Sequence, residues 1–390
     1  MRVNGRWLLI VCTATHIFVH VFTMMHVALI PVFTKELELS IHEAGLLVSI
    51  PQLISILISL PYGFIIDRID PRKLIALSLL MAGFSGLFAS QSWNFITLLA
   101  SISFIPLSSS IYHPPALKMI SEVFSGNRRS RALGIHGAGG TMGVAMGPVT
   151  IGLTLDRFGW RLSYLVWCVP VIFSALLAYT LPRMETAMGI EATREEDLKI
   201  SVNKKLTAML RKIERGYLLL LMAMAINSIG QKALSTYMTT YLVSMRGFSE
   251  SIASLLFGLN PFIGILGSLA GGYLSGKFRS KRWLSIAYIS RAFIYSGIWL
   301  SPLWMLAPIY LLGGFFGGSS LPASTTLVAR YTPKKRRGLA YTLFMLLPSL
   351  IGSISPLIAA WLIEAYNITG LFPFAITLTF LSILILQILP

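Results

Sequence analysis

Apolar runs of about 20 residues recur along the whole chain, and short stretches rich in charged residues, proline and glycine separate them. A run of this length, wound as an α-helix, spans the hydrocarbon core of a bilayer. The pattern therefore predicts an all-α membrane protein with twelve transmembrane helices. The expected spans are 7–33, 43–66, 74–91, 94–117, 131–156, 161–182, 216–244, 250–275, 283–301, 303–327, 338–363 and 367–389.

The start of the second span carries a local signal. Ser40 is followed three residues later by Glu43. At this spacing each side chain accepts a hydrogen bond from a backbone N–H group that a helix start leaves free. We therefore expect a capping box there.

The loop after the second span recurs later in the chain. The run GFIIDRIDPRK occupies residues 63–73, and the similar run GYLSGKFRSKR occupies residues 272–282, an offset of 209 residues. The same offset places LSIHEAGLL opposite FSESIASLL and SSSIYHPPA opposite GGSSLPAST. One offset shared by three separated features indicates an internal duplication. We expect two pseudo-symmetric six-helix halves, residues 1–182 and 216–390, joined by a linker at 183–215.

Composition and charge set the environment and the orientation. Charged residues make up only 12% of the chain, and the mean hydropathy is +0.73. The net charge is +17, and if the N-terminus is cytoplasmic, 26 of the 32 Lys and Arg residues fall on the cytoplasmic side and 4 on the outer side. By the positive-inside rule we expect a multi-pass protein of the cytoplasmic (inner) membrane with both termini in the cytoplasm. The basic loops, rather than nucleic-acid binding, then explain the positive charge.

The linker at 183–215 has two interpretations. Apolar residues recur at helical spacing among basic residues in its second part, which favours an amphipathic helix on the inner leaflet. The alternative is a solvated tether with no role beyond its length. The apolar positions are Leu206, Met209, Leu210, Ile213 and Tyr217.

Two six-span halves joined by a cytoplasmic linker, with a basic G-x-x-x-D-R loop after the second span and an echo of it after the eighth, resemble the major facilitator superfamily. The motif stands at Gly63, Asp67, Arg68 and Arg72, with Asp70 in place of the family's usual glycine. The resemblance implies the major facilitator fold and transport by alternating access. It also implies that the loop is a cytoplasmic latch, in which the Asp67 carboxylate pairs with arginines and holds the halves together. The alternative is that these charges only enforce orientation.

The fifth span carries a second pattern of this family. Its residues Gly139, Gly143, Gly147 and Pro148 resemble the G-x-x-x-G-P motif that is associated with exporters that exchange cargo against protons. Small residues let a neighbouring helix approach closely, and a proline permits a kink. Ordinary helix packing is the alternative interpretation. Together with SSSIYHPPA, this span resembles the fosmidomycin-resistance group and other prokaryotic drug-efflux permeases.

Polar side chains inside the spans are the candidates for cargo binding. The first and seventh spans carry polar stripes at spacings of three or four residues, and Lys232 lies near the middle of the seventh. Ionisable groups at that depth usually face a cavity or a partner, and the resemblance implies that spans 1, 4, 7 and 10 line a central cavity. Partners satisfied within helix packing are the alternative. The predicted substrate-binding residues are His16, His20, Asn227, Gln231, Lys232 and Ser235.

Three more ionisable residues lie within or at the ends of spans. His113 and His136, at similar depth near the inner ends of the fourth and fifth spans, are candidates for a gate or a proton relay. The alternative is that His113 only shapes the end of its helix. Arg291 lies in the middle of the ninth span, where we expect it to pair with a polar group between helices rather than to touch the cargo.

The charge in the membrane interior has one sign. All fifteen Asp and Glu residues can be placed outside the interior, which leaves only Lys, Arg and His inside. This arrangement favours an anionic cargo, such as a carboxylate or a phosphonate. It also leaves histidine as the group that titrates near neutral pH.

We therefore predict a secondary active transporter that exports a small organic anion across the cytoplasmic membrane in exchange for protons. The alternatives are an importer or facilitator of a metabolite anion and a general exporter of lipophilic drugs. A membrane-embedded enzyme or sensor is disfavoured, because the sequence places no paired carboxylates at depth and appends no soluble output domain. We expect no cofactor, metal ion or nucleic acid. The expected partners are the cargo, protons and the lipid bilayer, and a monomer suffices.

Overall fold

The computed structural model describes residues 4–62, 69–183, 214–333 and 337–390, and these residues form helices without strands. Ten helical segments in this described part are long and apolar enough to cross a membrane. The helices are α1 (Gly5–His20), α2 (Met25–Ala28), α3 (Ile30–Glu36), α4 (Ile41–Tyr62), α5 (Pro71–Ser90), α6 (Phe95–Ile102), α7 (Phe104–Val123), α8 (Gly126–Ala178), α10 (Arg215–Thr236), α11 (Met238–Ser244), α12 (Glu250–Phe278), α13 (Ser280–Leu300), α14 (Leu303–Arg330), α15 (Arg337–Tyr366), the 3₁₀-helix η3 (Ile368–Gly370) and α16 (Leu371–Ile388).

Each expected span corresponds to one helix, to a series of shorter helices or to one arm of a longer helix. The first span is divided into α1, α2 and α3, the fourth into α6 and α7, and the seventh into α10 and α11. The fifth and sixth spans form the two arms of α8, which meet at Gly159, where φ is 73° and ψ is 169°. A side chain is disfavoured at this positive φ, so glycine allows the turn from one span into the next. The all-α fold of twelve spans is confirmed, whereas the breaks within spans were not predicted.

Side-chain caps fix the start of the second span in each half. The backbone N–H of Ser40 donates to Glu43 Oε2 at 2.9 Å, and the N–H of Glu43 donates to Ser40 Oγ at 3.2 Å. The predicted capping box at α4 is therefore confirmed. Ser249, which stands 209 positions after Ser40, accepts from the N–H of Ile252 at 3.3 Å and caps α12 in the same manner.

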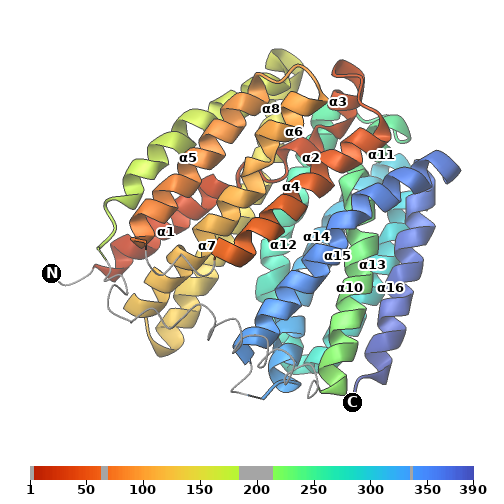
Figure 1. The fold of residues 1–390 in the computed structure, drawn as a ribbon. Helices are drawn as coiled ribbons and strands as arrows, with labels where there is room; N and C mark the ends of the chain where they lie inside the picture. The colour runs from red at the N-terminus through yellow and green to blue at the C-terminus, as the bar shows by residue number, and fades with distance from the viewer. Residues whose placement is uncertain (1–3, 63–68, 184–213, 334–336) are drawn as a thin grey trace.

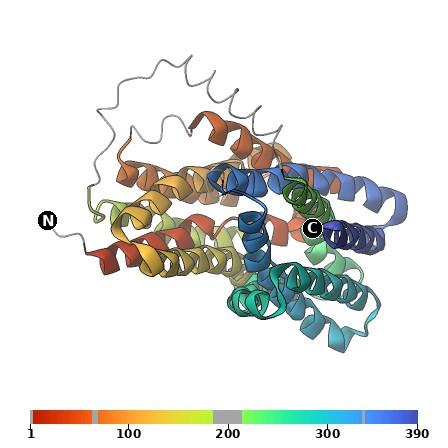
Figure 2. The same cartoon turned by 90° about the horizontal axis from the view of Figure 1, so that it is seen from below.

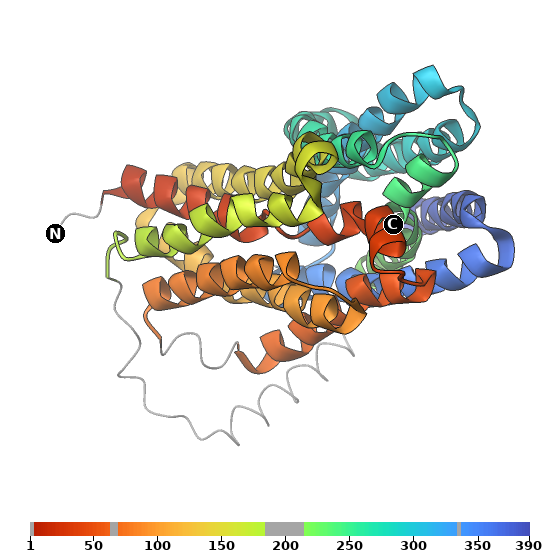
Figure 3. The ribbon, with the colours of Figure 1, turned by 90° about the horizontal axis from the view of Figure 1, so that it is seen from above.

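The predicted duplication is visible in the positions of the helices. α4 and α12 begin at Ile41 and Glu250, and α5 and α13 begin at Pro71 and Ser280, an offset of 209 residues in both pairs. The helices of the two halves form two groups that lie side by side, the first coloured red to yellow-green and the second green to blue (Figure 1). The views from below and from above show the same division (Figures 2 and 3).

The two groups are joined by hydrogen bonds at one side of the molecule. We call the side with the start of α1 and the end of α16 the termini side, and the side with the starts of α4 and α12 the opposite side. At the opposite side, Tyr237 Oη donates to the carbonyl oxygen of Ile41 at 2.9 Å, and Thr239 Oγ1 donates to that of Val27 at 3.3 Å. Ser251 Oγ also donates to Asp156 Oδ1 there. These bonds close the opposite side.

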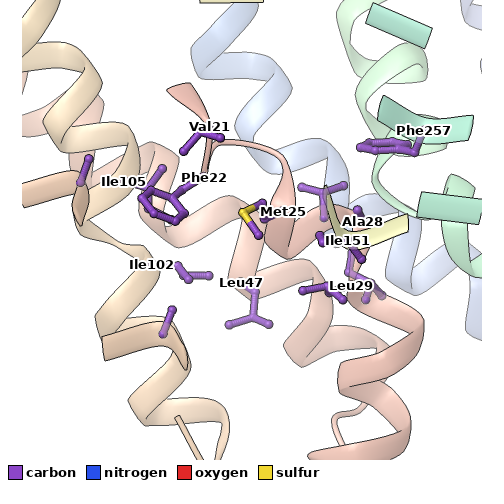
Figure 4. Close-up of a cluster of buried hydrophobic side chains, with 14 of the residues drawn as sticks. Val21, Phe22, Met25, Ala28, Leu29, Leu47, Ile102, Ile105, Ile151 and Phe257 are labelled. Atoms are coloured by element: carbon purple, nitrogen blue, oxygen red, sulfur yellow. The ribbon is translucent and has the colours of Figure 1, made fainter. Parts of the chain in front are cut away.

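An apolar layer supports the same closure. Met25, Ala28, Leu29 and Ile151 of the first half belong to one buried cluster with Phe257 of α12 (Figure 4). α4 packs against α15 and α8 against α12, so both groups contribute helices to the contact. The halves are therefore held together by packing as well as by hydrogen bonds.

Candidate functional site

A cavity of about 600 Å³ lies between α8 of the first half and α10, α12, α13 and α14 of the second. It begins where the contact between the halves ends: residues 145–152 of α8 pack against residues 255–258 of α12, and residues 134–141 and 260–269 of the same helices line the cavity. Its size is typical of a binding site for a small molecule, and its wall is largely apolar with a few polar groups, as such sites usually are. The polar side chains along it are Thr141, Gln231, Ser235, Asn260, Ser268, Arg291, Tyr295 and Tyr310.

Arg291 is the cation of this cavity. The side chain extends from the middle of α13 and is 5% exposed. Its Nη1 donates to Gln231 Oε1 at 3.2 Å, and its guanidinium lies over the Tyr288 ring at 5.4 Å from the centroid. No carboxylate among the described residues pairs with it. The sequence analysis expected the pairing with a polar group, but it missed that Arg291 also reaches a cavity.

Glycines of α8 divide between two environments. A Cβ atom added at Gly134 or Gly137, on the cavity side, would meet nothing within 4 Å. A Cβ added at Gly143 would lie 2.2 Å from the carbonyl oxygen of Ile17 in α1. A Cβ added at Gly139 would lie 2.7 Å from Cγ2 of Thr13 in α1, and one added at Gly147 would clash with the carbonyl oxygen of Val21, which directly follows α1. The structure thus places the span-5 glycines against the first helix, where a small residue is required. Pro148, next in the motif, lies inside α8, and the break in the interior of this helix is at Gly159 rather than at the proline.

Lys232 lies beside a second, smaller cavity. This cavity has a volume of about 60 Å³ and is lined also by His26 and Gln52 of the first half and Ser353 of α15. This cavity therefore lies between the two halves, and Lys232 is not among the residues that line the larger one. Asn227 is 5% exposed and lines neither cavity, whereas Gln231 and Ser235, on the same helix, face the larger one.

Four histidines come together inside the first half, and none of them lines either cavity. His20 Nε2 lies 3.2 Å from His113 Nε2, and the rings of His16 and His136 stack at 4.0 Å between centroids. His16 is 5% exposed, and its Nδ1 is 2.6 Å from the carbonyl oxygen of His136. The sequence analysis assigned His16 and His20 to the cargo and His113 and His136 to a gate. The structure places all four in one cluster.

The predicted latch is described only in part, because Gly63, Asp67 and Arg68 lie outside the described residues. Arg72 pairs with Asp70, two residues before it: Nη2 is 2.7 Å from Oδ2. Asp70 Oδ1 also accepts from the N–H of Arg72 at 3.0 Å and so caps α5. The hydrogen bonds from Arg72 lower the pKa of the Asp70 carboxyl group. Asp70, which replaces the usual glycine, is therefore a direct partner of Arg72.

The sequence matches the Major Facilitator Superfamily over residues 12–302 and, in a second match that overlaps the first, over residues 247–389. The chain belongs to this superfamily. As a member of it, with ten apolar helices in the described part, the chain is a multi-pass membrane protein.

Solved structures of this superfamily are similar over almost the whole chain. A bacterial homologue of the human lysosomal transporter Spinster, inward-facing and unoccupied, has a TM-score of 0.77 at 17% identity, and the alignment covers 99% of this chain and 95% of that one. A POT family transporter in complex with a thioalcohol-conjugated peptide has a TM-score of 0.74 at 14% identity, covering 97% and 94%. At these identities the similarity shows the fold.

Curated relatives are similar over part of their lengths. A probable L-galactonate transporter of Escherichia coli is 26% identical over 253 residues, 62% of this chain and 55% of the relative. A probable sugar efflux transporter of Helicobacter pylori is 24% identical over 252 residues, 64% and 60%. The methyl viologen resistance protein SmvA of Salmonella typhimurium is 30% identical over 164 residues, 41% and 33%. The chain therefore matches between one third and three fifths of the length of these relatives.

Proposed function

We propose that this superfamily member is a secondary active transporter that moves a small organic anion out of the cell in exchange for protons, by alternating access. The observation that carries the proposal is Arg291: a buried guanidinium at the wall of a 600 Å³ cavity, without a carboxylate partner among the described residues. A buried charge is costly unless it is paired. An anionic cargo supplies the missing charge.

The groups around Arg291 suit a hydroxylated carboxylate. A carboxylate accepts two parallel N–H bonds from a guanidinium, which gives both strength and orientation. The amides of Gln231 and Asn260 line the same cavity and provide hydrogen-bonding groups for hydroxyls. The relative that is named a probable L-galactonate transporter supports this choice, because galactonate is a hydroxylated carboxylate. We propose a sugar acid or a similar anion as the cargo class.

The closure of the opposite side fits one state of an alternating cycle. We propose that the termini side faces the cytoplasm, since the basic loops gather there, so that the cavity is in its inward-facing state. The similarity to an inward-facing solved structure supports this assignment. Opening to the outside then requires the bonds of Tyr237, Thr239 and Ser251 to break. The bonds of Tyr237 and Thr239 join neutral groups and are worth about 1 kcal/mol each, and the bond from Ser251 to the Asp156 carboxylate is worth about 2 kcal/mol, so cargo binding can shift the balance.

A second candidate is an exporter of lipophilic drugs, which the drug-efflux resemblance of the fifth span suggested. The largely apolar wall of the cavity and the methyl viologen resistance relative favour it. Methyl viologen is a dication, and Arg291 would repel it in this cavity. The two candidates therefore predict opposite effects of removing the Arg291 charge: it should weaken the binding of an anionic cargo and should leave unchanged or strengthen the binding of a cationic drug.

Thermal shift on the purified protein tests the cargo class. L-galactonate, galactose and methyl viologen are added in parallel to the wild type, to Arg291→Gln and to Arg282→Gln. Arg282 is an exposed residue of the same helix, so this control removes the same charge away from the cavity. We expect galactonate to raise Tm in the wild type and in Arg282→Gln but not in Arg291→Gln. Stabilisation by methyl viologen that is retained or increased in Arg291→Gln would refute the anion proposal.

Flux measurements test the coupling and the direction. Proteoliposomes are loaded with labelled galactonate, and an inward or outward pH gradient is imposed. We expect an opposing proton gradient to drive anion movement against its own gradient in the wild type and not in Arg291→Gln. Equal flux with and without the gradient would indicate a facilitator instead.

A further inference from the structure

We propose that the first half binds a divalent transition-metal ion, with zinc as the reference case, through His16, His20 and His113. His16 and His20 are four residues apart on α1 and so lie on one face of that helix. His113 reaches them from α7. One ring nitrogen from each of the three lies within 4.8 Å of the others. The site is independent of the cavity at Arg291 and of the cargo proposed above.

The spacing of two of these nitrogens already suits a metal. His20 Nε2 and His113 Nε2 are 3.2 Å apart. Zinc bonds to histidine nitrogen are about 2.0–2.1 Å long, and tetrahedral angles then separate neighbouring ligand nitrogens by about 3.4 Å. The third nitrogen needs to approach by up to about 1.4 Å, which rotation of a histidine side chain supplies.

The outer nitrogens of two rings are held as metal sites require. His16 Nδ1 lies 2.6 Å from the carbonyl oxygen of His136 and must carry the proton, since a carbonyl only accepts. The lone pair of His16 is therefore on Nε2, which is buried and has no hydrogen-bond partner. His20 Nδ1 lies 3.2 Å from Thr23 Oγ1, which also leaves its Nε2 for the cluster. Metal-binding histidines are characteristically oriented by such bonds at the other ring nitrogen.

The donor set selects the type of ion. Neutral imidazole nitrogens suit zinc, copper, nickel and cobalt, whereas magnesium and calcium require oxygen ligands. Ser109 Oγ lies 3.3 Å from His113 Nε2 and 3.5 Å from His20 Nε2, so one oxygen stands beside the ligand nitrogens. No carboxylate is among the grouped ligands. Three histidines leave one position of a tetrahedral ion for water, for this hydroxyl or for an anion.

The competing interpretation is that His20 and His113 share a proton. One protonated and one free Nε2 at 3.2 Å form an ordinary hydrogen bond, which is what the predicted proton relay would use. That arrangement requires only two histidines and gives no role to the unpartnered Nε2 of His16. The metal accounts for all three.

Cobalt binding to the full chain, purified through a tag without histidine, tests the proposal. Tetrahedral cobalt(II) absorbs strongly in the visible range. The spectrum of the wild-type protein therefore reports coordination without the need for a variant. We expect saturation at one Co²⁺ per chain, displacement by Zn²⁺ and no response to Mg²⁺. A cobalt spectrum no different from that of the aqueous ion would overturn the metal site and leave the shared proton.

Variants assign the ligands. His113→Asn and His20→Asn are compared with His42→Asn, which removes a histidine at the opposite side whose side chain is 42% exposed. We expect cobalt affinity to fall about tenfold or more in the first two and to be unchanged in the control. Equal affinity in all three would show that cobalt binds elsewhere. The readout does not involve transport, so its failure and the failure of the anion proposal are distinguishable.

Discussion

The two halves descend from one duplicated pattern, but they fill the equivalent part of their helices differently. Positions 22 and 86 of the first half correspond to positions 231 and 295 of the second at the offset of 209. In the first half, Phe22 is fully buried, stacks on Tyr164 at 5.8 Å between centroids and leaves no room for a side chain at Gly86. In the second half, Gln231 and Tyr295 line the large cavity. One half is packed where the other is open.

The difference extends to charge. Arg291 of the second half corresponds to Ala82 of the first, which is fully buried and apolar. An arginine in a packed interior would lose its hydration without compensation. Beside a cavity it can be solvated or can bind an anion. The duplicated pattern thus sets the architecture, and substitutions at equivalent positions decide which half offers a binding site.

The largest effect on stability should follow from removing a buried side chain in the packed first half. Phe22→Ala removes a fully buried ring, and we expect it to lower the free energy of unfolding by about 3 kcal/mol, because the surrounding helices cannot close the cavity completely. Gln231→Ala, at the equivalent position of the other half, borders space that is already open, so water can replace its hydrogen bond to Arg291 and the variant should cost less. Denaturant or thermal unfolding in detergent compares the two. Similar losses in both variants would contradict the contrast between the halves.

A smaller effect on stability should follow from adding a side chain to α8, and it should differ between the face that contacts α1 and the face that borders the cavity. Gly143→Leu forces a side chain against the backbone of α1, so we expect a loss of about 2 kcal/mol, in the range of overpacked cores. Gly137→Leu points into open space and should leave Tm nearly unchanged. It should instead reduce the stabilisation by galactonate, because it fills part of the cavity. If Gly137→Leu destabilises the protein as strongly as Gly143→Leu does, the result would contradict the position of Gly137 beside open space at the cavity wall.

The sequence predicted the features that depend on local pattern or on the duplication. The spans follow from apolar length, the cap at Ser40 from a spacing of three residues, and the second half from a constant offset. Features that depend on how helices rotate against one another were not predicted. His20 and His113 are far apart in the sequence, and nothing in the spacing of either helix indicates that their rings meet.

Arg291 illustrates the same limit. Its depth in the ninth span indicated a polar partner, and Gln231 is that partner. Whether the pair faces a neighbouring helix or a cavity depends on the small residues of α12 and α14 and on the open face of α8 at Gly134 and Gly137. Those residues lie on three separate helices, so their joint effect becomes visible only in three dimensions.

The smallest effect concerns the residue directly before α5 in the first half and its counterpart directly before α13 in the second. Asp70 caps α5 and pairs with Arg72, whereas its counterpart Arg279 precedes α13 with φ at 64° and makes no side-chain cap. We expect Asp70→Ala to lower the free energy of unfolding by about 1 kcal/mol, the usual value of a cap. Arg279→Gly should not lower it, because glycine adopts this backbone conformation without strain. If Arg279→Gly lowers the free energy of unfolding as much as Asp70→Ala does, the two positions do not differ in capping as proposed.

The pH dependence isolates the charge of Asp70 from its cap. Asp70→Asn keeps a capping oxygen but loses the ion pair with Arg72. Because the pKa of Asp70 is lowered in the folded state, its contribution is fully present above the ordinary aspartate pKa and is lost as the pH falls through the folded-state value. The wild type should therefore exceed Asp70→Asn in Tm at neutral pH, and the gap should close in acid. A gap that persists in acid would assign the stability to the cap alone, and the pair with Arg72 would then contribute nothing to holding the start of α5.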